Sequence, residues 1–478
     1  PTRRSSDLTN IRVWALDLSE EGVNESLVEV WVAGELDAAG TQDQQIAISA
    51  WGMSGESTAD DDWWGIFVEA GGGADFDHCV VRNALYAIQS NSHLSLTGCL
   101  IEDTKYLGLS VAYADTVTVD STTIRGPEYG INALLDTHLV LTNSTIEDCS
   151  LYGVALYKES VLDARTSTFE GNDIGLYLAR ETESWVEARV YDCTFTGNGD
   201  GIWIDDVGDS SVTVDDCMID DNTTNGIYVE DMGDVTITRN TITNNTVGVY
   251  SNGSEPVIRS RNVIQNNAGG VKCDNYSVAV VESSTVNNNT NAFAVLNDAN
   301  PDLGHATGGS SLGRNIIRPN TAYHVSNLTS NTIMAENNYW PKSPPSDCNP
   351  ASTKFYGSTD RSPNMGCSAP SLVSMAPRPP VAVAPKTFSI SQNYPNPFNP
   401  TTTISYDVPD PGSHVEIALY DVAGRLVTRL VDERKTAGSY HVGWNGMNVR
   451  GESVASGVYF MRMRAGSFLA TRKLVMLK

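Results

Sequence analysis

The stretch GIYVEDMGDVTITRNTIT, residues 226–243, contains the repeating unit that decides the fold of this 478-residue chain. Three short runs within it alternate apolar and polar residues: GIYV (Gly226–Val229), VTIT (Val235–Thr238) and NTIT (Asn240–Thr243). A period of two is typical of β-strands, and the residues that separate the runs are the Asn, Asp and Gly that turns favour. The stretch therefore predicts three short strands in a unit of about 23 residues.

The same unit recurs from residue 81 to residue 293. A first apolar column recurs every 20 to 26 residues, at Val81, Ile101, Ile124, Ile146, Phe169, Phe195, Ile219, Ile242, Ile264 and Val286. A second column follows seven or eight residues after each, at Ile88, Leu109, Ile131, Val154, Leu176, Ile202, Ile227, Val249, Val271 and Phe293. Self-similarity at so short a period is typical of a solenoid, in which each coil buries its apolar edge only against its neighbours.

Three short strands per coil resemble the right-handed parallel β-helix repeat family, whose members include pectate-lyase-like proteins. The resemblance covers most of residues 28–345. That family often opens with a Trp-Gly-Ile strand, matched here by Trp64-Gly65-Ile66, and often closes with Asn-Tyr-Trp, matched by Asn338-Tyr339-Trp340. The segment Val28–Ser49 is expected to form the first coil. We therefore predict an all-β chain that is dominated by a right-handed parallel β-helix.

Two further columns are expected inside the coils. An asparagine follows the first column by three residues at Asn172, Asn198, Asn222, Asn245, Asn267 and Asn289. Stacked turns favour Asn because it tolerates left-handed backbone and its amide can bond to its copy one coil away, so a structural ladder is predicted. Four cysteines precede the first column by two residues and should pack inward as small apolar side chains: Cys79, Cys99, Cys193 and Cys217.

The last ninety residues follow a different pattern. Strand-like runs lie between Gly, Pro and Asp turns at Ile404–Val408, Val415–Tyr420, Leu426–Val431, Tyr440–Trp444, Val458–Met463 and Leu469–Leu477, a spacing that suits a small antiparallel sandwich. The phrases YPNPFNPTT (Tyr394–Thr402), LYDVAGRLV (Leu419–Val427) and SGVYFMRMRAG (Ser456–Gly466) resemble the C-terminal sorting domain of type IX secretion cargo, and also the Ig-like domain of flagellar hook-capping proteins. The resemblance implies a secretion machinery as partner and an extracellular or outer-surface location.

These patterns divide the chain into five segments. Residues 1–8 (PTRRSSDL) resemble a translated sequencing adapter, so we expect the natural start to be missing. Residues 9–27 form an N-terminal segment, residues 28–368 the β-helix, residues 369–387 a Pro-rich linker and residues 388–478 the Ig-like domain. Cys348 and Cys367 bracket a Pro- and Ser-rich stretch, and in an exported protein they could form a disulfide.

Charge separates the same parts. The net charge is −27, which disfavours nucleic acid and anionic membranes as partners. From Phe388 onward, 10 Lys and Arg oppose 7 Asp and Glu, so this segment is mildly basic and the remainder carries the acidity. No apolar run is long enough for a transmembrane segment.

One outward column of the coils is aromatic. Alternation turns the residue after each second-column position to solvent, which gives Tyr177, Trp203, Tyr228 and Tyr250 in four consecutive coils. Coils lie about 4.8 Å apart, so the four rings would form a stripe of roughly 14 Å. Such a stripe beside carboxylates suits sugars, because rings stack on pyranose faces and carboxylates accept hydroxyl hydrogen bonds. Aromatic residues also stack along sheets for stability alone, so this alternative remains open.

Acidic residues accompany the aromatic stripe. Asp205 and Glu230 lie two residues beyond Trp203 and Tyr228 on adjacent coils. Carboxylates about 5 to 5.5 Å apart can serve as acid and nucleophile in glycoside hydrolysis, and a nearby basic residue such as Arg180 could act as the base of a lyase. With Asp206 and Asp231 they could alternatively hold Ca²⁺, or they could form a solvated acidic face.

The sequence leaves three functional hypotheses open. The first is a secreted or cell-surface protein that binds polysaccharide or another surface polymer through the face that carries Tyr177, Trp203, Tyr228, Tyr250, Asp205 and Glu230. The second is a polysaccharide lyase or glycoside hydrolase that acts on an acidic glycan. The third is a structural surface spacer. Whether the chain is an enzyme stays undecided, since the Gly-His-Gly and Arg-x-Lys motifs of polygalacturonase-like enzymes are absent from the sequence.

Overall fold

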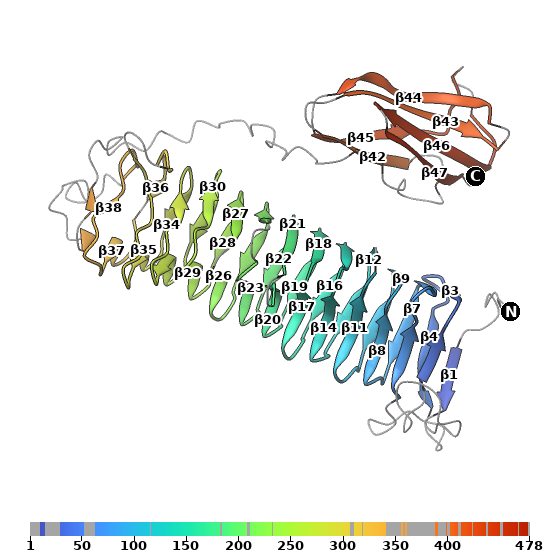
Figure 1. Ribbon diagram of the computed structural model, residues 1–478, viewed down its shortest axis with the longest axis horizontal. Coiled ribbons are helices and arrows are strands. Elements are labelled where there is room, and N and C mark those ends of the chain that lie inside the picture. The colour runs from blue at the N-terminus through green and yellow to red at the C-terminus, as the bar shows by residue number, and fades with distance from the viewer. Residues whose placement is uncertain are drawn as a thin grey trace. The chain divides into compact units, whose positions relative to one another are not determined.

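Three parallel sheets run along the N-terminal part of the molecule and form the sides of a β-helix (Figure 1). The computed structural model describes residues 10–14, 29–51, 63–114, 116–181, 184–207, 211–231, 233–305, 310–317, 319–340, 355–356, 359–360, 388–390, 398, 402–409, 413–422, 424–435, 438–449, 453–466 and 468–476. The chain forms two units, residues 1–371 and 372–478. Cys348 and Cys367, for which the sequence leaves a disulfide open, and the linker 369–387 lie outside the described residues, as do residues 1–8.

Sheet A contains β1 (Asn10–Trp14), β4 (Ile46–Trp51), β7 (Cys79–Arg82), β10 (Leu100–Glu102), β13 (Thr123–Arg125), β16 (Thr145–Glu147), β19 (Thr168–Glu170), β22 (Thr194–Thr196), β25 (Met218–Asp220), β28 (Thr241–Thr243), β31 (Val263–Gln265), β34 (Thr285–Asn287) and β36 (Ile316–Ile317). Sheet B contains β2 (Glu29–Val32), β5 (Gly65–Val68), β8 (Tyr86–Ser90), β11 (Leu107–Ala112), β14 (Tyr129–Leu134), β17 (Tyr152–Tyr157), β20 (Ile174–Ala179), β23 (Asp200–Asp205), β26 (Asn225–Glu230), β29 (Val247–Asn252), β32 (Gly269–Asp274), β35 (Asn291–Val295), β37 (Tyr323–Asn327) and β39 (Phe355–Tyr356). Sheet C contains β3 (Glu35–Ala39), β6 (Gly73–Asp77), β9 (His93–Thr97), β12 (Val117–Asp120), β15 (His138–Thr142), β18 (Ser160–Arg165), β21 (Val186–Tyr191), β24 (Ser211–Asp215), β27 (Asp234–Thr238), β30 (Val257–Arg259) and β33 (Val280–Val281), and a separate pair is formed by β38 (Ile333–Met334) and β40 (Thr359–Asp360).

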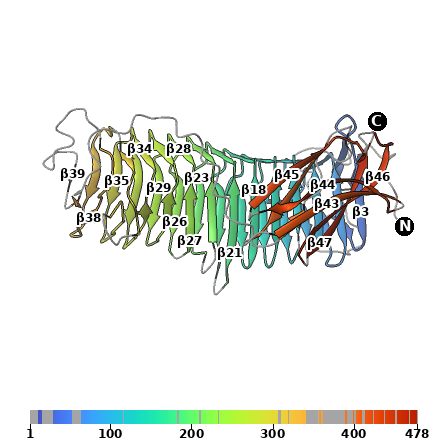
Figure 2. The same ribbon diagram turned by 90° about the horizontal axis from the view of Figure 1, so that it is seen from above.

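Each coil passes through sheet B, sheet C and sheet A before the next coil begins, and the coils follow one another along one axis (Figures 1 and 2). The predicted unit of three strands per coil is confirmed, and its three runs correspond to β26, β27 and β28. The expected first coil is formed by β2, β3 and β4. Strand β1 precedes the expected start at residue 28 and adds one strand to sheet A by pairing in parallel with β4.

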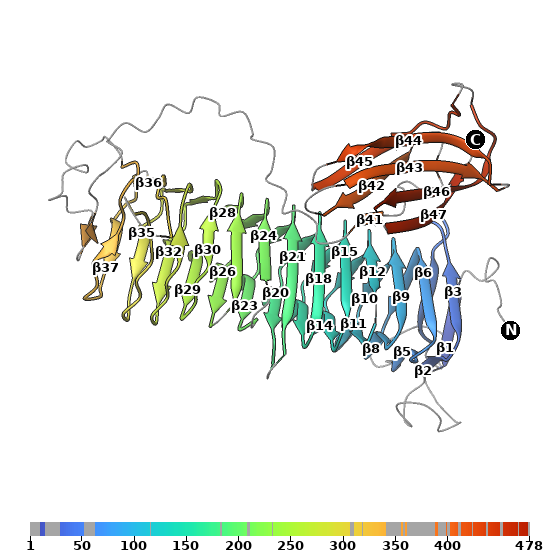
Figure 3. The ribbon, with the colours of Figure 1, turned by 45° about the horizontal axis from the view of Figure 1, so that its top comes forward.

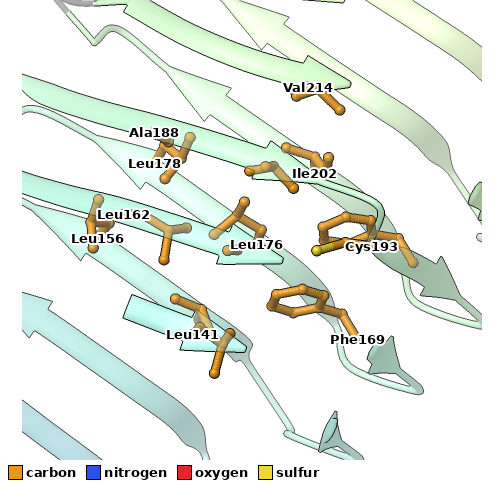
Figure 4. Packing of buried hydrophobic residues seen from close by; sticks show 14 of the residues in the cluster. Leu141, Leu156, Leu162, Phe169, Leu176, Leu178, Ala188, Cys193, Ile202 and Val214 are labelled. Carbon is orange, nitrogen blue, oxygen red and sulfur yellow. The ribbon is translucent and has the colours of Figure 1, made fainter. Parts of the chain in front are cut away.

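The two apolar columns form the core, as predicted. The first column lies on sheet A and the second on sheet B, and every member of both is at most 1 % exposed. Phe169 and Phe195 stack in adjacent coils with ring centroids 4.4 Å apart, and Figure 4 shows Phe169 among Leu156, Leu176 and Ile202 in the interior. Because each apolar side chain packs on its copies in the coils above and below, a lone coil could not bury it.

The asparagine ladder is confirmed in the interior. Asn222, for example, is 1 % exposed, and its Oδ1 accepts hydrogen bonds from the backbone N–H of Asn198 at 3.1 Å and from Nδ2 of Asn198 at 2.9 Å. The expected left-handed backbone, however, belongs to the preceding residue, such as Asp221 with φ of 57°. The ladder asparagines are therefore selected for their amide bonds, and the turn before them carries the left-handed conformation.

A second asparagine ladder was not predicted. Asn240, Asn262, Asn315 and Asn338 occupy the position two residues before the first column that Cys79 and Cys99 hold in the early coils. Oδ1 of Asn262 accepts the backbone N–H of Asn240 at 3.0 Å, and Asn338 continues the ladder to Asn315 at the same distance. The closing Asn-Tyr-Trp motif therefore ends this ladder. All four cysteines that were expected to point inward are buried.

Glycine is required where coils approach closely. Gly65 of the opening Trp-Gly-Ile motif has φ of 131°, and a Cβ there would lie 1.6 Å from the carbonyl oxygen of Tyr86. Gly201, which precedes a second-column residue, lies so close to the next coil that its Cβ would be 2.6 Å from the carbonyl oxygen of Gly226. A side chain at either position would push adjacent strands of sheet B apart.

Charges alternate on the outer face of sheet A. Arg82, Glu102, Arg125 and Glu147 form a charge ladder across four coils, with N···O distances of 2.6, 3.6 and 2.5 Å. The arginines are about half exposed (45 % and 49 %), so solvent weakens each pair and the ladder contributes modestly to stability.

The C-terminal unit contains two antiparallel sheets (Figure 3). One sheet has the strand order β41 (Ser389–Ile390), β42 (Thr402–Val408), β45 (Gly438–Trp444), and the other has the order β44 (Leu426–Lys435), β43 (Ser413–Asp421), β46 (Gly457–Ala465), β47 (Phe468–Met476). All six predicted strands are present. They enclose a separate core that includes Ile404, Leu419, Trp444 and Met461.

Candidate functional site

The predicted aromatic stripe lies on the outer face of sheet B. Tyr177, Trp203, Tyr228 and Tyr250, which we call the aromatic ladder, belong to β20, β23, β26 and β29 and are opposite one another in the strand register. Their ring centroids are 5.6, 5.2 and 4.9 Å apart in succession. All four rings are partly exposed. The register prediction is therefore confirmed: four coils present adjacent aromatic rings outside the core, in edge-to-face and tilted contacts.

The aromatic surface is longer than predicted. Tyr152, the first residue of β17, stacks on Tyr177 with centroids 4.7 Å apart and an interplanar angle of 12°. Tyr129 follows on β14, 5.3 Å from Tyr152. Strict alternation would place the Tyr152 side chain inside, with that of Val154. Tyr152 is, however, the first residue of its strand, where the period of two no longer determines the direction of the side chain. The tyrosine at this position in two successive coils was the signal that could have identified it.

Polar side chains border the ladder on the side of the next coil. The Tyr177 hydroxyl donates a hydrogen bond to Oδ2 of Asp205 at 2.8 Å, and the Tyr250 hydroxyl donates to Oδ2 of Asp274 at 3.1 Å. Nδ2 of Asn252 donates to both the Tyr228 hydroxyl and Oε1 of Glu230 at 2.9 Å. The hydroxyl of each ladder tyrosine is thus hydrogen-bonded to a polar group of the next coil, whereas the buried Nε1 of Trp203 has no hydrogen-bond partner within the described residues.

The charges on this face follow from these contacts. Burial and the hydrogen bond to Asp205 raise the pKa of Tyr177, so its phenol stays protonated and remains a donor. For Asp274, burial raises the pKa, but hydrogen bonds from Asn297 and Tyr250 and the charge of Lys272 outweigh it and lower the pKa. Asp274 is therefore a carboxylate at neutral pH.

The candidate base, Arg180, is engaged by an acid other than the two candidate acids. Asp205 and Glu230 are neighbours in the register of β23 and β26. Arg180 instead forms an ion pair with Asp206, with Nη2 2.7 Å from Oδ2. Its guanidinium charge is therefore partly neutralised beside the loop after β23 and is not paired with the two candidate acids.

The calcium hypothesis gains no support from side-chain positions. In the described parts of the chain, His, Cys, Asp and Glu side chains form no group of three or more that could hold a metal ion. Asp205, Asp206, Glu230 and Asp231 all belong to those parts. The acidic residues are spread along the face as successive coils repeat, and Asp206 is engaged with Arg180.

A second polar cluster, on the outer face of sheet C, was not predicted. Asp163 on β18 accepts a hydrogen bond from Nε2 of His138 at 2.9 Å and lies 3.4 Å from Nη1 of Arg189. Burial raises the pKa of Asp163, but the bond from His138 and the charge of Arg189 outweigh it and lower the pKa. The cluster consists of strand neighbours that neutralise one another, and it is best explained as local stabilisation.

With this fold and face established, the chain can be placed in a class, the right-handed β-helix proteins. It belongs to the family described as right handed beta helix region, whose model matches residues 64–209 and 182–339. Residues 395–467 match the FlgD Ig-like domain, in agreement with the predicted resemblance. No curated protein matches the chain. Within the described ranges, no helix is long and apolar enough to cross a membrane.

Several solved structures are similar. The A-module of Azotobacter vinelandii mannuronan C-5 epimerase AlgE6 is 17% identical with a TM-score of 0.40, covering 63% of this chain and 87% of that one. The AlgE4 A-module of the same organism is 16% identical with a TM-score of 0.32, covering 70% and 86%. The enzymatically active domain of bacteriophage CBA120 tailspike protein 2 is 10% identical with a TM-score of 0.25, covering 94% and 72%. At such scores these likenesses carry no information about a shared activity.

Proposed function

We propose that the outer face of sheet B, from β17 to β32, binds a polysaccharide. The observation that carries this proposal is the aromatic ladder, a continuous series of ring contacts outside the core with hydrogen-bonding groups along one side. Rings of this kind stack on the apolar faces of sugars, while carboxylates and amides exchange hydrogen bonds with sugar hydroxyls. The ladder spans about 14 Å at the spacing of parallel strands.

The contacts of the candidate acids favour binding over catalysis. Arg180 forms an ion pair with Asp206, and within the described residues Asp205 accepts a hydrogen bond from the neutral hydroxyl of Tyr177 and Glu230 accepts one from the neutral amide of Asn252. A lyase or hydrolase acting on a glycan is the alternative, and a structural spacer is the second alternative. Both are distinguished from binding by the experiment below.

We also propose that the protein acts outside the cell, exported through residues 388–478. The support is the similarity of this unit to sorting domains of type IX secretion cargo, together with its match to the FlgD Ig-like domain. The test is a fusion of residues 388–478 to a reporter in a bacterium that has a type IX system. Reporter retained inside cells that export a genuine cargo would refute this part of the proposal.

The binding test uses affinity electrophoresis in gels that contain neutral, acidic or amino polysaccharides. Trp203→Ala and Tyr228→Ala should each abolish most of the retardation, and Tyr191→Ala, which removes a partly buried ring from the outer face of sheet C, should not. Melting curves confirm that each variant is folded. Unchanged retardation in both ladder variants would refute the proposed site, and no retardation of the native protein in any gel would favour a spacer. Products that absorb in the ultraviolet would instead identify a lyase, and new reducing ends alone a hydrolase.

A further inference from the structure

Asp205 and Glu230 form a pair of neighbouring carboxylates beside the two middle rings of the aromatic ladder. They occupy equivalent positions on β23 and β26, so their backbones are one strand spacing apart, about 4.8 Å. Both side chains are partly exposed. Across the described residues, no Lys, Arg or His forms an ion pair with either carboxylate, whereas two neighbouring acids, Asp206 and Asp274, are each paired with a cation.

At the Tyr250 end of the aromatic ladder, a lysine ammonium group lies beside both a ring and a carboxylate. Nζ of Lys272 lies 3.8 Å from the centroid of the Tyr250 ring and 3.5 Å from Oδ2 of Asp274. The Tyr250 hydroxyl donates to that same Oδ2. A ring, a carboxylate that it donates to and an ammonium group thus form a complete set, stabilised by cation–π and charge attraction.

The same pair of ring and carboxylate occurs three coils earlier without its lysine. Tyr177 donates to Oδ2 of Asp205 as Tyr250 donates to Asp274. In the strand register, Trp203 follows Tyr177 at the position where Lys272 follows Tyr250. The Asp205 site therefore has two rings and a second carboxylate, Glu230, nearby, and it lacks the ammonium that completes the set at Asp274.

We propose that the polysaccharide is cationic, a polymer of 2-amino sugars with free amines, and that Asp205 and Glu230 bind its ammonium group beside Trp203. This inference rests on the proposed function and names the ligand class of the same face. Charge complementarity favours it, since carboxylates attract an ammonium and repel a polyuronate. Aromatic rings beside carboxylates are also the chemistry that recognises ammonium ligands.

The experiment measures Kd for three oligosaccharides of equal length and linkage: hexamers of glucosamine, N-acetylglucosamine and glucose. Titration calorimetry is done at mildly acidic pH, where the sugar amine is protonated. The glucosamine hexamer should bind about tenfold more tightly than the glucose hexamer, as two partly exposed charge contacts would allow, and this preference should fall as salt is raised. The N-acetyl hexamer, which has no charge, should bind like the glucose hexamer.

Three variants localise the preference. Asp205→Asn combined with Glu230→Gln removes both charges but keeps oxygen acceptors for Tyr177 and Asn252, and it should bring the affinity ratio of glucosamine to glucose hexamers close to one. Lys272→Met removes the internal competitor at Asp274 and should increase the ratio. Asp234→Asn, an exposed acid at the start of β27, is the matched control and should leave the ratio unchanged.

The outcomes separate this inference from the proposed function. Equal affinity of the native protein for the amino and neutral hexamers would overturn the cationic ligand and leave glycan binding standing. A preference that survives in the Asp205 and Glu230 double variant would overturn the assigned site. Absence of binding to all three hexamers and to every polysaccharide gel would overturn the proposed function itself.

Discussion

Truncating Asn222 to alanine should destabilise the β-helix strongly. The Asn222 side chain takes part in four hydrogen bonds: its Nδ2 donates to the carbonyl of Phe195 at 3.2 Å and to Oδ1 of Asn245 at 2.9 Å, and its Oδ1 accepts from N and Nδ2 of Asn198 at 3.1 and 2.9 Å. Alanine removes all four of these hydrogen bonds. The backbone N–H and the Nδ2 of Asn198, both in the interior, then each lose the acceptor that Asn222 provided. At about 1–3 kcal/mol for each buried group left unsatisfied, the expected cost is about 3–4 kcal/mol.

The assay is urea denaturation followed by circular dichroism, with hydrogen exchange measured by peptide. Asn225→Ala is the matched control, because Asn225 lies three residues farther along the chain but is partly exposed and its side chain bonds to Asp200, where water can replace it. The control should cost about 0.5–1 kcal/mol. Amide protection in Asn222→Ala should fall first in the coils on either side of the substitution. Equal destabilisation of less than about 1 kcal/mol in both variants would refute the claim that the ladder stabilises the interior.

Three further outcomes are expected. Glu102→Gln interrupts the charge ladder of sheet A and should cost about 0.5–1 kcal/mol, most of which disappears in 1 M salt; a loss that ignores salt would contradict a charge effect. The pKa of Asp163 is lowered in the folded state, so its stabilisation is present above its ordinary value of 3.8 and is lost as the pH falls below it; the melting temperature of Asp163→Asn should therefore stay below that of the native protein above pH 3.8 and approach it only at lower pH, and a constant gap would refute this. Burial raises the pKa of Cys149 and of Cys273 to about 12, so mass spectrometry should find neither alkylated by iodoacetamide in the native protein at mildly alkaline pH, and both alkylated in urea.

The fold and the aromatic ladder were predictable because both depend only on spacing. A fixed number of strands per coil and a period of two within each strand suffice to place Tyr177 beside Trp203, and the observed register agrees. The asparagine ladder follows in the same way. The left-handed residue of its turn was misplaced by one position, since Asp221 and Asn222 are both turn formers and composition does not tell which of them adopts φ of 57°.

Features that depend on side-chain direction were not predictable. Spacing placed Arg180 on the same face as Asp205, but rotamers decide that its guanidinium reaches Asp206 instead. Likewise, the position of Lys272 over the Tyr250 ring depends on how a long, flexible side chain folds back, which spacing does not determine. The second asparagine ladder was missed because Cys and Ser occupy its position in other coils, which hides the repeat in any count of a single residue type.

The uniform register of sheet B has an evolutionary consequence. Duplication or loss of one complete coil would move every column by one step and leave the remaining rings aligned, whereas residues added in the turns between sheets B and C would leave the columns untouched. The coils already differ in length, from 20 to 26 residues, while Tyr177, Trp203, Tyr228 and Tyr250 stay in line. Gene recombination that adds or removes complete coils could thus lengthen or shorten this surface by one ring at a time without a change of fold.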